Sequence, residues 1–176
     1  MGNFYTQVLV SNDSSEACEG VMKAIGRRAL IGPKFRNIVP IFDSESEKQE
    51  IGELDSVALT LSHELQSWAV GIMNHDDDYL LFRLFYRGEE LQHISASRMG
   101  SFNTSGLNSL RKAVCPKAPW VSLYWALSRP ALFQVGRHQS VARALGLASW
   151  TVGAGYRYLQ AEDVEEHPGL DQFVSL

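Results

Sequence analysis

Apolar positions recur with two different periods in the first 65 residues. Residues 4–10 form an aromatic and β-branched run, which predicts a first strand. Asp13 followed by Glu16 predicts a capping box at the start of a helix. Helical spacing then brings four apolar side chains onto one face: Cys18, Val21, Met22 and Ile25. The predicted order is therefore strand, then helix.

A second strand and a second helix follow. Residues 37–43 predict a strand, and Pro40 predicts that it lies at a sheet edge or carries a bulge, because proline has no N–H to donate. Farther along, four apolar residues repeat at intervals of three and four positions: Leu54, Ala58, Leu61 and Leu65. That spacing predicts a second amphipathic helix.

Three further apolar runs are separated by short polar turns. The runs are residues 68–73, 79–86 and 91–96, and the turns between them are residues 74–78 and 87–90. Asparagine and aspartate favour tight turns, because their side chains form hydrogen bonds with nearby backbone groups. This pattern predicts an antiparallel meander of three strands.

The composition changes after the meander. Residues 97–108 are rich in Ser, Gly and Asn, and they predict a mobile loop or an internal boundary. Helical patterns follow in three segments: residues 107–115, 119–127 and 137–147. Residues 149–159 predict a returning strand, in which Gly153 and Gly155 mark a bulge or a close backbone approach.

Together these elements predict an α+β fold. We expect a mixed or antiparallel sheet of five to six strands, with helices packed on it and a mainly helical second half. The 176 residues are 45% hydrophobic, enough for one core, so residues 1–176 are expected to form a single compact domain. The 97–108 loop is the place for a possible internal boundary within it.

Length and composition also limit the cellular setting. No stretch approaches the ~18 to 20 apolar residues that a membrane-spanning helix needs, and the amino-terminus lacks the pattern of a signal peptide. Cys18 and Cys115 lack the spacing of a redox or zinc motif, which favours free thiols in a reducing compartment. We therefore expect a soluble cytoplasmic protein.

Charge is distributed unevenly along the chain. Residues 91–161 contain no aspartate or glutamate but eight Lys or Arg residues, whereas all 20 carboxylates and the other eight cations lie outside that segment. Such asymmetry biases the choice of partners. The net charge of −4 makes nucleic acid an unlikely partner, since phosphate contacts demand a strongly basic footprint. An acidic protein or an anionic small molecule remains possible.

The best candidate for an anion site is at the start of the 137–147 helix. Free backbone N–H groups there, together with Arg137 and His138, are suited to phosphate or carboxylate. If residues 153–158 return beside them, Arg157 and Tyr156 would complete the pocket. The alternative is that Arg137 pairs with an acidic residue of the first half and that His138 only packs.

A weaker metal candidate lies in the first turn of the meander. His75, Asp76 and Asp78, with Asp77 between them, are the densest group of possible metal ligands in the chain. The spacing differs from that of a calcium-binding loop, which places oxygens at alternate positions and adds a glycine and a distal glutamate. Turn chemistry alone also explains the composition.

Common catalytic motifs are missing from the sequence. His63 and Glu64 begin like a zinc protease motif, but Ser67 stands where the second histidine belongs. The glycines at 153 and 155 lack the third glycine of a dinucleotide loop, and neither a nucleophile elbow nor a phosphate-binding loop occurs. We therefore expect no cofactor and assign no catalytic residue.

Aromatic side chains accompany the cations of the later half. Such a mixture occurs in proteins that stack nucleic-acid bases on rings, but aromatics at helical spacing more often form a core. Trp120, Tyr124 and Leu127 are spaced as one buried face of a helix would require.

Three short motifs carry a resemblance. They are residues 2–6 (GNFYT), residues 74–78 (NHDDD), and Arg137-His138 leading through residues 144–147 (ALGL) to residues 155–158 (GYRY). Together they resemble a family of bacterial hypothetical proteins of similar length. The resemblance implies a bacterial cytosolic origin and transfers no catalytic role.

Two functions are compatible with these features. The first is a non-enzymatic interaction or regulatory module, whose basic half meets an acidic partner. The second is a small enzyme or binding protein that uses Arg137, His138 and Arg157 on an anionic small molecule.

Overall fold

The computed structural model describes residues 3–98, 101–161 and 168–176, and within them the fold is α+β. Its centre is a single sheet of eight strands in the order β7-β6-β5-β4-β1-β3-β2-β8, and every neighbouring pair is antiparallel. The strands are β1 (Tyr5–Ser11), β2 (Ala29–Ile31), β3 (Ile38–Asp43), β4 (Trp68–His75), β5 (Tyr79–Tyr86), β6 (Glu89–Ser97), β7 (Phe102–Asn103) and β8 (Val174–Ser175).

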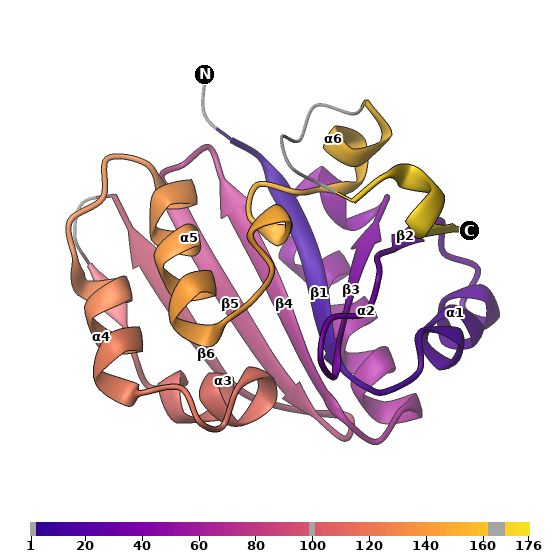
Figure 1. Cartoon of the computed structure of the whole chain (residues 1–176), viewed down its shortest axis with the longest axis horizontal. Coiled ribbons are helices and arrows are strands. Elements are labelled where there is room, and N and C mark those ends of the chain that lie inside the picture. Colours follow the sequence, from indigo (N-terminus) through magenta and orange to yellow (C-terminus); the bar gives the residue numbers. More distant parts are fainter. Residues whose placement is uncertain (1–2, 99–100, 162–167) are drawn as a thin grey trace.

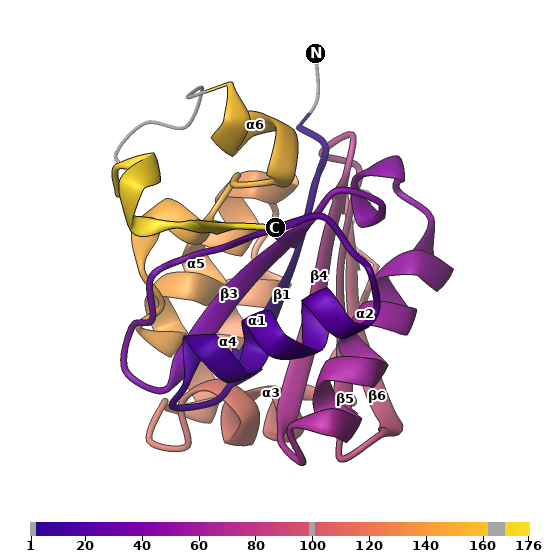
Figure 2. The same cartoon turned by 90° about the vertical axis from the view of Figure 1, so that its right-hand side faces the viewer.

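Helices cover both faces of this sheet (Figures 1 and 2). They are α1 (Ser15–Ala24), α2 (Ile51–Glu64), α3 (Leu107–Val114), α4 (Trp120–Ser128), α5 (Gln134–Leu145) and α6 (Tyr156–Gln160), with short 3-10 turns at Ser46–Lys48, Ser149–Thr151 and Leu170–Gln172. Helices α1 and α2 lie on one face, and α3 to α6 lie on the other. The first half thus supplies one helical layer and the second half supplies the other.

The central strand β1 shows why two layers are needed. Val8 and Val10 face α1 and α2, whereas Leu9 faces α3, α4 and α5. Because successive side chains of a strand point to opposite faces, a strand that is apolar at consecutive positions must be covered on both sides. The two helical layers supply that cover.

The prediction of five to six strands is wrong, because three short strands were missed. These are β2, β7 and β8, with three, two and two residues. A strand of that length has no detectable alternation. The three strands of the meander, in contrast, form β4, β5 and β6 as predicted, and each has at least eight residues.

The expected edge position of β3 is also wrong, since β3 lies between β1 and β2. The backbone carbonyl of Pro40 accepts the N–H of Gly32, so the side of Pro40 that lacks a donor faces away from β1. On that side β2 has already ended at Ile31. The ladder bond that Pro40 cannot form is a donation to Gly32, just beyond the end of β2, so an interior proline is tolerated.

Residues 149–159 do not return as a strand. They form a 3-10 turn at Ser149–Thr151 and helix α6. Trp150 and Leu159 pack on Phe42 of the sheet, so the apolar side chains cover the sheet instead of joining it. The predicted close backbone approach is confirmed at Gly155, where a Cβ atom would lie 2.2 Å from Oε1 of Glu47.

The predicted helices are present, with shifted boundaries. Helix α1 is capped by Ser14, whose hydroxyl accepts the N–H of Ala17, and not by Asp13. Helix α5 begins at Gln134, three residues before the predicted start. Of the helices that the structure describes, none combines the length and the apolar character of a transmembrane span.

Candidate functional site

Arg137 is buried in the second helical layer and is only 3% exposed. Its Nη1 donates to the backbone oxygen of Ser97 at 3.1 Å and to Oε1 of Gln134 at 2.7 Å, and its Nη2 donates to the backbone oxygen of Arg129 at 3.0 Å. Burial lowers the pKa of this guanidinium. Arg137 therefore ties the carboxyl end of α4 to β6 and α5, and its partners are oxygens of neutral groups.

His138 is fully buried beside β1. Its Nδ1 lies 2.8 Å from the hydroxyl of Tyr5, and the Tyr5 and His138 rings stack with their centroids 5.7 Å apart. Burial holds the pKa of His138 at about 3, so the ring is neutral near pH 7. A neutral, enclosed imidazole has no charge to offer an anion. His138 therefore agrees with the alternative prediction, in which its side chain only packs.

Tyr156 and Arg157 lie in a different part of the second layer. They begin helix α6, where the backbone N–H of Tyr156 donates to Oε1 of Glu47 at 2.7 Å. Arg157 lines a cavity with Glu47, whereas Arg137 lines a cavity along α4 and α5. Arg137 and Arg157, predicted for one anion site, thus line different cavities, and neither lining includes His138 or Tyr156.

The aspartate turn after β4 is built around Asp77, which is buried. Its carboxylate accepts four hydrogen bonds: from the backbone N–H and the side-chain amide of Asn3, from the amide of Asn74, and from the backbone N–H of Val135. Val135 is in the first turn of α5, whose own capping position, Phe133, offers no side-chain acceptor. Asp77 therefore caps α5 across 58 residues.

The three residues predicted as metal ligands, His75, Asp76 and Asp78, are exposed. His75 faces Oε1 of Gln49 through Nδ1 at 3.3 Å, and Asp78 lies 3.7 Å from Arg98. Asp76 and Asp77 both adopt positive φ angles of 52° and 54°, as tight turns require. Within the described ranges no three His, Cys, Asp or Glu side chains are grouped as a metal site would need. The plain turn explains the motif.

The cations of residues 91–161 are largely left without carboxylate partners. Arg98 has a carboxylate within 4.0 Å, and the other seven have none in the part of the chain that the structure describes. Arg129 and Arg143 are both exposed and line one cavity. This pair, rather than Arg137 and His138, presents positive charge to solvent.

Helix α4 exposes Trp120, which was predicted to lie on a buried face, and it also exposes Trp125. Trp120 is 42% exposed and Trp125 is 55% exposed, and both rings contact Tyr124. The core face of α4 is formed instead by three smaller residues: Leu123, Ala126 and Leu127. The prediction that Trp120 is buried is therefore wrong. Trp120 and Trp125 instead form an aromatic part of the surface.

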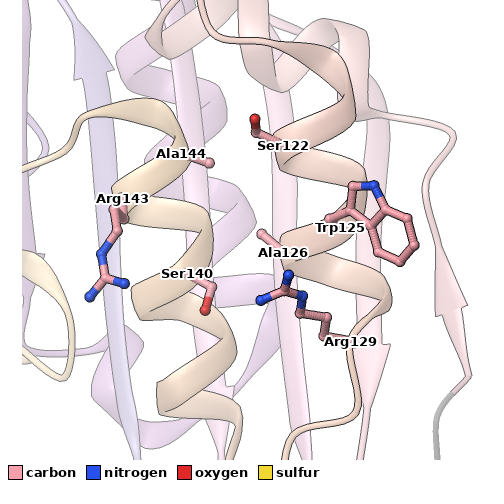
Figure 3. Close-up of a pocket in the computed structure, with 7 residues that line it drawn as sticks. All are labelled: Ser122, Trp125, Ala126, Arg129, Ser140, Arg143 and Ala144. Carbon is pink, nitrogen blue, oxygen red and sulfur yellow. The ribbon is translucent and has the colours of Figure 1, made fainter.

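The exposed ring of Trp125 borders a groove between α4 and α5 (Figure 3). The groove has a volume of about 520 Å³ and continues into a neighbouring hollow of about 490 Å³ beside the loop that joins the helices. Its lining residues are Ser122, Trp125, Ala126, Arg129, Ser140, Arg143 and Ala144. The Arg129 side chain extends between the helices, and Arg143 lies on the outer surface of α5. We call this surface the α4–α5 groove.

The hollow adds two apolar side chains to the groove. Leu132, which is 74% exposed, and Phe133 lie on the loop between the two helices. Exposed apolar side chains that gather beside polar ones are a feature of interaction sites. The groove therefore combines apolar contact area with the guanidinium of Arg129, and Arg143 adds positive charge on the outer surface of α5.

Sequence reasoning missed three residues that organise these sites. Glu47 was read as part of a charged connector, and Trp125 and Arg129 were not distinguished from their neighbours. For Trp125 a signal was present, because Leu123 and Leu127 share the opposite face of a short helix. Glu47 has no local signal, since its donors come from β1 and α6.

The fold and this surface define a three-layer α+β protein that carries an aromatic and cationic groove on one helical layer. Comparisons with protein-family models, with curated proteins and with solved structures found no match. Gly2, in the first of the three motifs, lies outside the described residues.

Proposed function

We propose that this chain is a non-enzymatic interaction module that binds an acidic, amphipathic helix of another protein in the α4–α5 groove. The exposure of Trp125 beside Arg129, whose guanidinium has no carboxylate partner among the described residues, carries the proposal. Tryptophan and arginine are among the residues most enriched at the hot spots of protein interfaces, where a few side chains contribute most of the binding free energy. The resemblance to bacterial hypothetical proteins supports a cytoplasmic setting.

Helix geometry favours a helical occupant. Two neighbouring helices leave a furrow into which the side chains of a third helix fit, and an amphipathic helix presents a stripe of apolar residues to such a furrow. Helix α5 has 12 residues and is about 18 Å long. A partner helix of about three turns would span it.

Charge favours an acidic partner. Arg129 and Arg143 lie at the groove, and the whole segment from residue 91 to residue 161 contains no carboxylate that could neutralise them locally. Complementary charge accelerates encounter and excludes wrong partners. A nucleic acid is disfavoured, because the 20 carboxylates of the remaining chain repel a polyanion.

A selection from a peptide library displayed on phage tests the proposal. Peptides of about 16 residues, long enough to cover the groove, are selected on the immobilised protein. We expect the enriched sequences to be acidic, with apolar residues at helical spacing. Trp125→Ala should weaken their binding by a factor of about 30, as expected when a central aromatic contact is removed.

The control is Leu91→Ala on β6, which removes an exposed apolar side chain far from the groove and should leave binding unchanged. Arg129→Gln should weaken binding less than Trp125→Ala and should reduce its dependence on salt. Enrichment of basic peptides, or binding that survives Trp125→Ala, would overturn the proposal. So would a dimer of this chain that dissociates on Trp125→Ala, since the occupant would then be a second copy.

A further inference from the structure

A second cavity lies at the opposite end of the same helical layer. It has a volume of about 320 Å³ and is lined by Phe4, Glu47, Gln49, Arg157 and Tyr158. Pockets for small ligands begin at about 300 Å³. The size therefore suits a molecule of roughly the dimensions of an amino acid.

Glu47 forms the buried acidic side of this cavity. Its side chain lies beside the first residues of β1, which β3 does not pair with. The pairing of these two strands begins at Val8, so the N–H of Thr6 has no strand partner. The carboxylate accepts that N–H and also the N–H of Tyr156. Each carboxylate oxygen has two lone pairs, so two hydrogen bonds leave capacity for further donors.

Arg157 supplies the basic side. Its positive charge stabilises the Glu47 carboxylate, yet no nitrogen of Arg157 lies within 4.0 Å of a Glu47 oxygen. The guanidinium of Arg157 also has no hydrogen-bond partner in the ranges that the structure describes. The two opposite charges thus line one cavity without forming a direct ion pair.

Gln49 adds an unused donor. Its side-chain oxygen faces His75, while its buried amide nitrogen has no partner among the described residues. A buried donor without an acceptor costs free energy, unless a ligand or water completes it. Phe4 and Tyr158 add aromatic surface to the cavity.

We propose that this cavity binds a small zwitterion, namely a free α-amino acid, with its ammonium group on Glu47 and its carboxylate on Arg157 and Gln49. A molecule with both charges satisfies the separated carboxylate and guanidinium at once. A simple anion would leave Glu47 repelling it, and a simple cation would leave Arg157 doing the same. The site is independent of the α4–α5 groove.

The acidic side predicts how binding depends on pH. Burial is the main cause that raises the pKa of Glu47 to about 7; Arg157 lowers it and Asp43 raises it. An ammonium ligand favours the charged carboxylate, so affinity should rise as the pH increases through 7. Affinity should level off once Glu47 is ionised.

The probes are the common free amino acids, tested singly by thermal unfolding and by titration calorimetry at pH 6 and pH 8. We expect at least one to raise the melting temperature, more strongly at pH 8. Its N-acetyl derivative lacks the ammonium group, and its amide lacks the carboxylate. Each should bind at least about tenfold more weakly, since one charge of the cavity is then unmatched.

Arg157→Gln removes an exposed side chain that the fold does not use, so this variant should fold and bind about tenfold more weakly. Arg87→Gln, which removes an exposed arginine in the turn between β5 and β6, is the matched control and should bind normally. The proposal is overturned if no amino acid binds, if the N-acetyl derivative binds as well as the free amino acid, or if Arg157→Gln leaves affinity unchanged. None of these outcomes alters peptide binding in the α4–α5 groove.

Discussion

The hydroxyl of Tyr5 and Nδ1 of His138 lie 2.8 Å apart in the fully buried space between β1 and α5. This hydrogen bond joins the first strand to a helix 133 residues later. Both groups are shielded from water, so neither could form a hydrogen bond with water if its partner were removed. The bond is therefore a fixed link between the sheet and the second helical layer.

Removing the hydroxyl should destabilise the protein. Tyr5→Phe keeps the ring but leaves Nδ1 of His138 unpaired, and we expect a loss of about 1 to 3 kcal/mol in the free energy of unfolding. Urea denaturation followed by circular dichroism measures it. The double variant Tyr5→Phe/His138→Phe should lose less than the sum of the two single variants. Additive losses would show that the two groups do not interact.

His138 should make stability depend on pH. Its pKa is about 3 in the folded protein and about 6.5 when unfolded, so between these values only the unfolded chain binds the proton. Stability should therefore fall as the pH drops from 6.5 toward 3. Relative to His138→Phe, the wild-type protein should lose up to about 3 kcal/mol between pH 7 and pH 4. A constant difference between the two proteins would contradict a buried neutral histidine.

Glu47 should act with the opposite sign. Its pKa is about 7 in the folded protein, against an ordinary value of 4.5, so the folded chain holds a proton that the unfolded chain has released. Stability should fall as the pH rises from 4.5 through 7. Compared with Glu47→Gln, the wild-type protein should lose about 2 to 3 kcal/mol over that interval. Denaturation at pH 5 and pH 8 tests this, and an equal gap at both values would refute it.

Asp77 should contribute more to stability than its neighbour. Asp77→Gly removes four accepted hydrogen bonds, including the cap of α5, and should cost about 2 to 3 kcal/mol. Asp76→Gly is the matched control, because both aspartates have positive φ and Asp76 is exposed. That change should be neutral or slightly stabilising. Equal effects at the two positions in thermal unfolding would argue against the cap.

Gly155 should tolerate no larger residue. Its φ of −142° suits any amino acid, but a Cβ atom would lie 2.2 Å from Oε1 of Glu47 and 2.9 Å from Cβ of Tyr5. We expect Gly155→Ala to cost about 1 to 3 kcal/mol through this overlap. Gly136→Ala, in open space on α5, should instead stabilise by about 0.5 to 1 kcal/mol. Chemical denaturation of both variants measures these two changes in the free energy of unfolding.

Regular elements of this fold were predictable where a period repeats often enough. Strands β4, β5 and β6 follow from apolar runs bounded by polar turns, and helix α2 follows from helical spacing; each of these elements has at least eight residues. The strand predicted at residues 149–159 is wrong, because aromatic and β-branched side chains suit a strand and also suit a segment that packs on the face of a sheet. Composition alone does not separate these two uses.

The candidate sites were harder to predict, for a physical reason. Arg137 was expected to hold an anion or a carboxylate, but its partners are mostly backbone carbonyls, which every residue has. The positive charges of the later half do remain largely without carboxylate partners among the described residues. Which of them face solvent depends on how α4 and α5 pack, and no local pattern specifies that.

The two edges of the sheet differ in the strands that form them, and this affects whether another chain can pair with them. Strand β7 covers β6 only near Ser95 and Ala96, and the uncovered part of β6 begins with Glu89 and Glu90 after a register irregularity at Leu84. Negative charge and a local bulge hinder docking of a further strand. At the other side the last strand has two residues. Fibre growth by edge-to-edge pairing is thereby discouraged.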